Sequence, residues 1–352
     1  MLKKIIGGFL EVSEQSIQEY EKSVLNYLLT VYERKIFYND GRQIINAILT
    51  YFSGKRFNKY YVPSYLGGSI LQAYNQNNIA VTFYEIKNHF SYILENNISN
   101  SIIFLIDYFG TEKITNNKIK ELLDNNIIIL DVTHSLFNSE RYKIVHPNLF
   151  LFSSLGKIFP IPAGSVLFHS DKNFIDEQIA SNDHYYMLDL MLKKYFDVKY
   201  DLKYDDKIYF DYKRYEQNKD DSIIRSETIP LISKYILSNL GFDKIYRMRR
   251  ANLNYLYNNI DRKVSIISKD EIKSPFFFPI KLPNLTVRNS LQAELTKNNI
   301  YCPIHWILPE IIPRKFNYSY NLSNTILSLP IDQRYNPSDL TNMVDIVNSF
   351  IN

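Results

Sequence analysis

Two residues that could act together chemically follow neighbouring strand-length segments of the chain. Asp131 comes directly after the apolar residues 127–130, and Lys157 lies just past the apolar residues 149–152. In the simplest interpretation the two form a solvated ion pair. Alternatively, a carboxylate and an amine at neighbouring strand ends could take part in a reaction together. Spacing alone favours the ion pair, so the choice depends on the surrounding sequence.

The segments that position these residues are short apolar runs separated by helical stretches. They cover residues 60–62, 79–84, 102–106, 127–130, 149–152 and 165–168. Continuous apolar strands that alternate with helices indicate a mostly parallel sheet with helices on both faces. Ligands of such sheets bind beyond the carboxyl ends of the strands, where Asp131 and Lys157 lie. We therefore predict an α/β fold with a three-layer α/β/α large domain.

Helical patterns precede the first of these segments. Residues 13–30 carry apolar side chains at helical spacing, and Ser13 and Ser16 are candidate caps. A second helix is expected over residues 43–49, directly after an Asp-Gly turn at residue 40. The N-terminus of that second helix is therefore expected to face a ligand.

The pattern changes in the second half of the chain. Residues 228–259 are expected to be helical, with Arg249 and the neighbouring arginines in solvent, and residues 275–283 are expected to form a strand pair. We predict two domains. Residues 1–234 would form an N-terminal arm and the large domain, and residues 235–352 a smaller α+β domain.

The composition excludes several classes of protein. The formal net charge of the 352-residue chain is +4, which is too small to indicate binding to nucleic acid or to an anionic membrane. A single cysteine excludes an internal disulfide framework, and the six histidines show no spacing typical of a metal site. No apolar run approaches the ~20 residues of a membrane span. We expect a soluble cytoplasmic protein with no bound metal ion.

The sequence at the two strand ends resembles segments of known enzymes. Residues 131–137, Asp-Val-Thr-His-Ser-Leu-Phe, and residues 152–157, Phe-Ser-Ser-Leu-Gly-Lys, resemble cofactor segments of pyridoxal-phosphate enzymes of the aspartate-aminotransferase fold, fold type I. They look most like the sugar aminotransferase family called DegT/DnrJ. Residues 6–11, 40–43 and 327–332 resemble further segments of that family, in the same order. The resemblance is patchy but spans nearly the whole chain.

This resemblance implies pyridoxal 5'-phosphate as the cofactor and assigns catalytic roles. Lys157 corresponds to the Schiff-base lysine, which also moves a proton during the reaction. Asp131 would keep the cofactor's ring nitrogen protonated, because opposite charge favours the charged form. Asp107 also ends a strand-length segment and is the alternative, but the match at His134 favours Asp131. His134 would lie along the cofactor ring or hydrogen-bond its phenolic oxygen.

The resemblance also assigns residues to the cofactor phosphate and to the substrate. A phosphate needs backbone donors at a helix start together with a hydroxyl or guanidinium group. Gly41 and Arg42 would open the phosphate-binding helix, and Ser153 or Ser154 would supply the hydroxyl. His305 lies in a late loop, Tyr-Cys-Pro-Ile-His-Trp, that looks like the family's loop near the substrate.

The sequence departs from the family pattern at two places. An aromatic residue usually stacks on the cofactor ring at the position of Gly67, so Tyr65 would have to supply the ring face here, or the cofactor is covered differently. An Asn-x-Arg segment that the partner subunit often contributes is not evident, and Ile223 stands where its asparagine is expected.

The function implied by the resemblance is transfer of an amino group, typically from glutamate, to a nucleotide-linked keto-sugar. It further implies a homodimer and a role in bacterial surface polysaccharide biosynthesis. Three alternatives remain open. They are other pyridoxal-phosphate chemistry on the same fold, a degenerate relative that binds the cofactor without turnover, and an unrelated α/β enzyme such as a glycosyltransferase.

Overall fold

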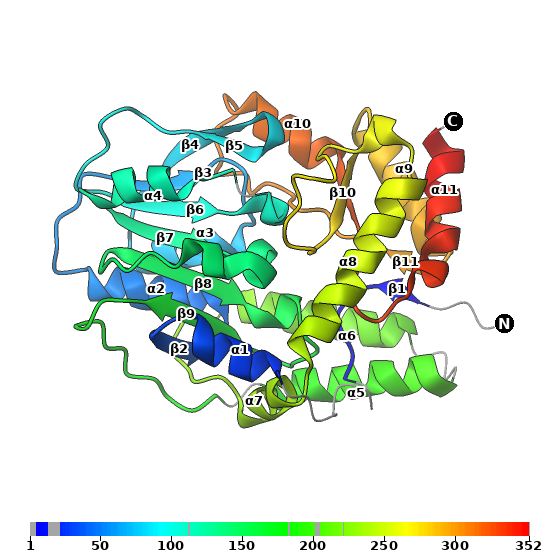
Figure 1. Cartoon of the computed structure of the whole chain (residues 1–352), viewed down its shortest axis with the longest axis horizontal. Coiled ribbons are helices and arrows are strands. Elements are labelled where there is room, and N and C mark those ends of the chain that lie inside the picture. The colour runs from blue at the N-terminus through cyan, green and yellow to red at the C-terminus, as the bar shows by residue number, and fades with distance from the viewer. Residues whose placement is uncertain are drawn as a thin grey trace.

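A computed structural model of the chain describes residues 5–12, 22–111, 113–181, 184–200, 205–220 and 222–351, and its centre is an eight-stranded sheet (Figure 1). The strands are, in spatial order, β2 (Arg34–Tyr38), β9 (Ser165–His169), β8 (Leu149–Ser154), β7 (Ile127–Asp131), β6 (Ile102–Ile106), β3 (Tyr60–Pro63), β4 (Thr82–Lys87) and β5 (Ser91–Ile93). Strands β4, β3, β6, β7 and β8 run parallel, whereas β9, β2 and β5 pair antiparallel to their neighbours. The predicted mostly parallel sheet is confirmed.

The apolar strands are buried because helices cover both faces of the sheet (Figure 1). Every residue of β6, β7 and β9 is buried, which explains why these strands appear in the sequence as continuous apolar runs. The helices around the sheet are α1 (Val24–Val31), α2 (Gly41–Tyr51), α3 (Ser69–Gln76) and α4 (Asn116–Leu123). Helix α2 packs against β8, β9 and α3, and α4 packs against β7.

The N-terminal helices differ in part from the expectation. Helix α1 begins at Val24, where the Ser23 side chain accepts a hydrogen bond from the Asn26 N–H at 3.1 Å. The expected caps Ser13 and Ser16 lie outside the described residues. Helix α2 begins at Gly41, as the Asp-Gly turn predicted.

The C-terminal part of the chain forms a smaller α+β unit beside the sheet (Figure 1). Its elements are α8 (Phe242–Asn259), β10 (Phe278–Lys281), α9 (Leu285–Lys297), β11 (Ile300–Tyr301), α10 (Asn317–Thr325), β12 (Ile326–Leu329) and α11 (Thr341–Ile351), whereas the preceding helix α7 (Leu231–Ser238) packs against α1. The expected strand pair over residues 275–283 is wrong, because β10 is the one strand there and pairs antiparallel with β12. The expected domain boundary after residue 234 falls inside α7 and stays a prediction.

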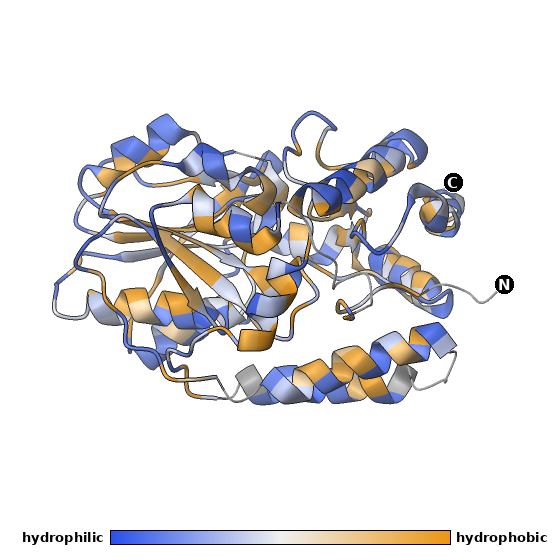
Figure 2. Ribbon diagram, turned by 60° about the horizontal axis from the view of Figure 1, so that its bottom comes forward, coloured by the Kyte–Doolittle hydropathy of each residue, from blue (hydrophilic) through white to orange (hydrophobic). Residues whose placement is uncertain are grey.

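Two long helices form a hairpin that lies along one side of the molecule (Figure 2). They are α5 (His184–Tyr200) and α6 (Asp205–Asp220), and they contact each other. Large apolar side chains on this hairpin are exposed, namely Tyr185, Tyr186, Leu192, Phe196, Val198, Tyr200, Tyr209 and Phe210. The N-terminal strand β1 (Ile6–Gly7) pairs in parallel with β11, so the start of the chain joins the C-terminal part.

Arg249 of α8 is buried rather than solvated, contrary to the expectation. Its guanidinium donates to the carboxamide oxygen of Gln333 at 2.7 Å and to the carbonyl oxygens of Phe276 at 3.1 Å and Ile158 at 3.2 Å. Ile158 directly follows Lys157, so this arginine ties the lysine-bearing turn to the C-terminal part. The sequence does not reveal these contacts because all the partners of Arg249 are distant along the chain.

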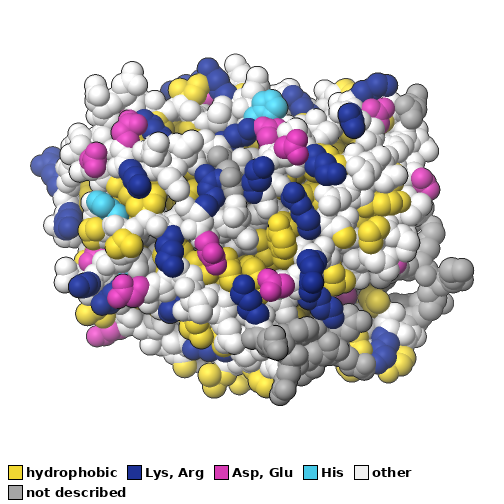
Figure 3. Space-filling view, in the orientation of Figure 1, with side chains coloured by type: hydrophobic (Ala, Val, Ile, Leu, Met, Phe, Trp, Pro, Cys, Tyr) yellow, Lys and Arg dark blue, Asp and Glu magenta, His cyan; other side chains and the backbone are white. Residues whose placement is uncertain are grey.

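The surface shows basic and acidic side chains interspersed on the face seen in Figure 3. This mixture agrees with the small net charge of the chain. Among the described residues, no helix combines the length and apolar character needed to cross a membrane.

Candidate active site

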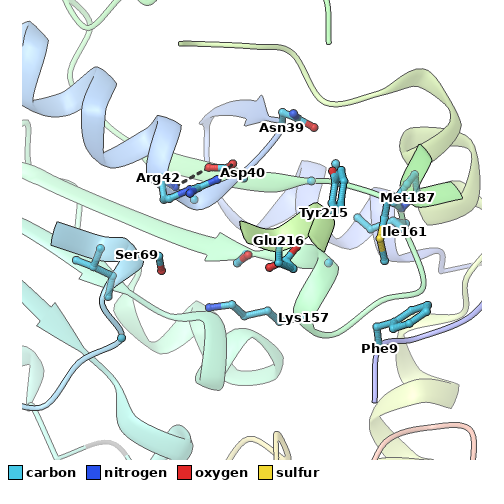
Figure 4. A pocket seen from close by; sticks show the side chains of 18 of the residues that line it. Phe9, Asn39, Asp40, Arg42, Ser69, Lys157, Ile161, Met187, Tyr215 and Glu216 are labelled. Carbon is cyan, nitrogen blue, oxygen red and sulfur yellow. Dashed lines mark hydrogen bonds and ion pairs between the residues drawn. The ribbon is translucent and has the colours of Figure 1, made fainter. Parts of the chain in front are cut away.

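A cavity of about 260 Å³ lies beyond the carboxyl ends of β7 and β8. Its walls come from distant parts of the chain: the N-terminal segment, the starts of α2 and α3, helices α5 and α6, and the loop after β11. Figure 4 shows Lys157 extending into this space, with Arg42 and Ser69 at one end and Phe9 and Ile161 at the other. The cavity lies where a parallel sheet is expected to bind its ligand.

Asp131 and Lys157 both line this cavity. Asp131 is the last residue of β7, and its carboxylate accepts a hydrogen bond from the Thr133 N–H at 2.8 Å. Burial raises the pKa of Asp131, while the Lys157 charge and the bonds from Thr133 oppose that rise. The Thr133 hydroxyl oxygen in turn accepts from the Ser154 N–H at 2.9 Å, which joins the ends of β7 and β8. The predicted pair therefore lies together at one partly shielded site.

The start of α2 also lines the cavity, through Gly41 and Arg42. However, the Asp40 carboxylate already accepts hydrogen bonds from the Arg42 N–H at 2.8 Å and the Gln43 N–H at 3.2 Å. The Arg42 guanidinium donates to Asp40 at 3.2 Å and to Gln72 at 2.7 Å. An acidic cap thus occupies the Arg42 amide, which the resemblance assigns to a phosphate, and the Arg42 guanidinium supplies positive charge at the same place.

The two serines at the end of β8 have different surroundings. Ser154 is partly exposed and lines the cavity. Ser153 is fully buried, and its hydroxyl has no hydrogen-bond partner among the described residues. Of the two serine candidates, the structure brings Ser154 to the cavity.

His134 is buried behind the cavity wall and is not among the described residues that line it. Its Nδ1 accepts a hydrogen bond from the Phe109 N–H at 3.0 Å, so the ring proton is assigned to Nε2. Burial, together with the charges of His305 and Lys157, lowers the pKa of His134 well below its ordinary value. The imidazole is therefore neutral at physiological pH and packs between other rings.

Tyr65 and His305 likewise lie outside the described lining of the cavity. Tyr65 is fully buried, and its hydroxyl donates to the His305 carbonyl oxygen. The Nδ1 of His305 lies 2.9 Å from the Ser328 hydroxyl, and burial lowers the pKa of His305 to about 3. These two predicted residues instead tie the loop after β11 to the connection after β3 and to β12.

Several residues that line the cavity were not identified from the sequence. Trp306 is adjacent to the predicted His305 and is the single tryptophan of the chain. These two facts could have identified it from the sequence. Tyr215 and Glu216 of α6 face the cavity in Figure 4, and nothing in the local sequence marks them. Phe9 stacks on Tyr212 of α6 with ring centroids 4.6 Å apart. Among the described residues, no group of three or more histidine, cysteine or acidic side chains is arranged to hold a metal ion.

The known proteins that match this chain are matched by their three-dimensional structures. No protein-family model matches the sequence, and no curated protein matches it. PseC of Helicobacter pylori, an aminotransferase involved in the biosynthesis of pseudoaminic acid, is 14% identical and aligns over 99% of both chains with a TM-score of 0.66. A DegT DnrJ EryC1 StrS aminotransferase from Brucella abortus is 15% identical, aligns over 91% of this chain and 86% of that chain, and has a TM-score of 0.58.

A third similar structure is that of an enzyme named as a synthase and not as an aminotransferase. The 8-amino-7-oxononanoate synthase of Francisella tularensis is 16% identical, with 98% of this chain and 89% of that chain covered and a TM-score of 0.54. These likenesses show that the chain has the same fold as these three enzymes, which confirms the predicted α/β fold. Because one fold hosts several reactions, the function must be argued from the site.

Proposed function

We propose that the protein is a pyridoxal-phosphate-dependent aminotransferase. The observation that carries this proposal is the meeting of Asp131 and Lys157 in one cavity at adjacent strand ends. A lysine and a carboxylate beyond a parallel sheet are the two groups that this cofactor needs at its aldehyde and at its ring nitrogen. The sugar aminotransferases among the similar structures support the same conclusion.

The residues present fit the cofactor at three points. Asp131 can accept a hydrogen bond from a protonated ring nitrogen, whose charge would also favour the ionised carboxylate. At the helix start, Gly41 lines the cavity, where backbone N–H groups can bind a phosphate. Arg42 supplies the guanidinium for a phosphate, although it is shared with Asp40. The acidic cap opposes an anion at this end.

The chain's own residues then divide the chemistry. Bound pyridoxal phosphate supplies an electron sink for the carbon next to the transferred nitrogen. Lys157 would hold the cofactor through Nζ, and its free amine would move a proton between two neighbouring carbons. Asp131 keeps the opposite end of the ring protonated. The hydrogen bond from Thr133 fixes the carboxylate for this task.

We propose a nucleotide-linked keto-sugar as the amino acceptor and an amino acid as the donor. Phe9, Tyr212 and Tyr215 place aromatic surfaces along the cavity, and Glu216 brings a carboxylate that could accept hydrogen bonds from sugar hydroxyls. A place in bacterial surface polysaccharide biosynthesis in the cytoplasm belongs to this proposal. The exposed apolar side chains of α5 and α6 support a homodimer, because such a surface is typical of a protein interface.

Absorbance spectroscopy tests the proposed function directly. The protein purified with pyridoxal phosphate should show a visible absorption band that borohydride abolishes, and peptide mapping should then find the reduced adduct on Lys157. Lys157→Ala should lose the band and the amino transfer, and Lys120→Ala, at an exposed position of α4, is the matched control. Absence of the band from the wild-type protein would overturn the proposal.

A second candidate, pyridoxal-phosphate chemistry without amino transfer, is favoured by the similarity to the oxononanoate synthase. The two candidates differ in the fate of the donor nitrogen. A donor labelled with heavy nitrogen should pass its label to the acceptor only in the aminotransferase. Cofactor binding with no turnover of any donor would instead indicate a non-catalytic relative.

A further inference from the structure

Gly67 lies against the indole ring of Trp306. A Cβ atom placed on Gly67 would lie 3.0 Å from Cδ1 and 3.1 Å from Nε1 of Trp306, closer than ordinary van der Waals contact. Both residues line the cavity that contains Lys157. The indole therefore occupies the space that a side chain at position 67 would enter.

Other aromatic rings hold this indole in place. The Trp306 ring stacks on His134 with centroids 5.4 Å apart and an interplanar angle of 19°. His134 stacks in turn on Phe276 at 4.1 Å and 20°. Tyr65 and Tyr108 contact the indole edge-on at 5.6 Å and 6.0 Å. Because moving the ring would break all these contacts, Trp306 is a fixed part of the wall.

The neutral state of His134 favours this arrangement. Its pKa is lowered well below the ordinary value, and its Nδ1 accepts from the Phe109 N–H. A neutral imidazole stacked between Phe276 and Trp306 supports the indole from the side of the sheet. His134 thus acts through Trp306 and is a positioning residue.

We propose that Trp306 supplies the aromatic surface that covers the cofactor ring, in place of a side chain at position 67. This inference rests on the proposed function. Position 67 belongs to the connection between β3 and α3, whereas Trp306 comes from the loop after β11. Covering the ring from that loop makes cofactor binding depend on the docking of the C-terminal part. Only one of positions 67 and 306 can carry an aromatic side chain, because the two side chains would occupy the same space.

The wild-type protein provides the first test, because Trp306 is its single tryptophan. Titration of the cofactor-free protein with pyridoxal phosphate should quench the tryptophan emission in step with the rise of the visible absorption band. A titration in which the band forms while the emission stays unchanged would overturn the inference. This measurement needs no variant and no catalytic activity.

Binding to variants provides the second test. Trp306→Leu should raise the dissociation constant for pyridoxal phosphate roughly fivefold. This is the factor expected for one lost ring contact. Trp306→Phe should restore most of that loss. Phe277→Leu is the matched control, because Phe277 packs against His305 at 4.9 Å in the same aromatic group but is not among the described residues that line the cavity.

The reciprocal variant separates stacking from a general packing defect. Gly67→Phe should weaken cofactor binding in the wild-type background, where it meets Trp306, and should improve binding when combined with Trp306→Leu. Circular dichroism and thermal melting would establish that each variant is folded. Equal damage from Gly67→Phe in both backgrounds, or unchanged binding by Trp306→Leu, would overturn the inference.

The two proposals fail in distinguishable ways. If the wild-type protein forms no borohydride-sensitive band, the proposed function fails and this inference fails with it. If the band forms on Lys157 and Trp306→Leu binds the cofactor as tightly as the wild type, only the role of Trp306 is refuted.

Discussion

Arg334 holds the N-terminal segment against the C-terminal part of the molecule. Its guanidinium donates to Asp332 at 2.7 and 2.9 Å and to Glu11 at 2.6 Å. It also donates to the carbonyl oxygens of Phe9 at 3.2 Å and Gly7 at 3.1 Å. The Arg334, Asp332 and Glu11 side chains are only 13%, 9% and 14% exposed, so water screens these charges weakly. The position of Phe9 in the cavity wall therefore depends on Arg334.

We expect Arg334→Met to lower the free energy of unfolding by about 3 kcal/mol, near the low end of the loss typical of breaking a buried ion pair. Burial alone would raise the pKa values of Asp332 and Glu11, but the charge and hydrogen bonds of Arg334 outweigh it and hold both below their ordinary values. Without Arg334, two carboxylates stay buried. Lys194, 3.3 Å from Glu11, compensates only part of their charge.

Urea unfolding at neutral pH, monitored by circular dichroism, measures this loss. The matched control is Arg247→Met on α8, where the arginine is exposed and the change should stay within about 0.5 kcal/mol. Arg334→Lys keeps the charge but not the planar fork, so we expect an intermediate loss. A loss below about 1 kcal/mol for Arg334→Met, or equal losses in Arg334→Met and the control, would refute the reasoning about the buried network.

Three further predictions follow from the site and its surroundings. Asp40→Ser keeps a helix cap but removes a negative charge from the start of α2. Equilibrium dialysis should therefore show that this variant binds pyridoxal phosphate at least about fivefold tighter than the wild type. Weaker binding would show that Asp40 assists binding of the phosphate. Asp131→Asn should lower kcat by a factor on the order of 10², while borohydride should still produce the reduced adduct on Lys157. An unchanged kcat would exclude Asp131 as the partner of the ring nitrogen. Burial lowers the pKa of Lys194 to about 8 from an unfolded value of 10.5, so its contribution to stability is complete above pH 10.5 and is lost as the pH falls through 8. The stability of the wild type relative to Lys194→Met should therefore rise between pH 8 and 10.5, and a difference that does not change with pH would contradict this origin.

The sequence determined the central sheet because burial on both faces leaves a local signature. Strands such as β6 and β7 appear as unbroken apolar runs, and the polar residue after each run marks the carboxyl end. Asp131 and Lys157 were found for this reason. In contrast, β2 begins with Arg34 at an exposed edge of the sheet, and this charged start hides the strand.

Only the tertiary structure decided what surrounds the reactive pair. Trp306 reaches the cavity from a loop far along the chain, and Glu216 reaches it from a helix whose local sequence looks like solvated surface. The burial of Arg249 is likewise invisible in a sequence that places it among other arginines. A strand end is defined by neighbouring residues, so local patterns reveal it. The wall of a cavity is defined by segments that meet only after the C-terminal part docks on the sheet, and no local pattern encodes that meeting.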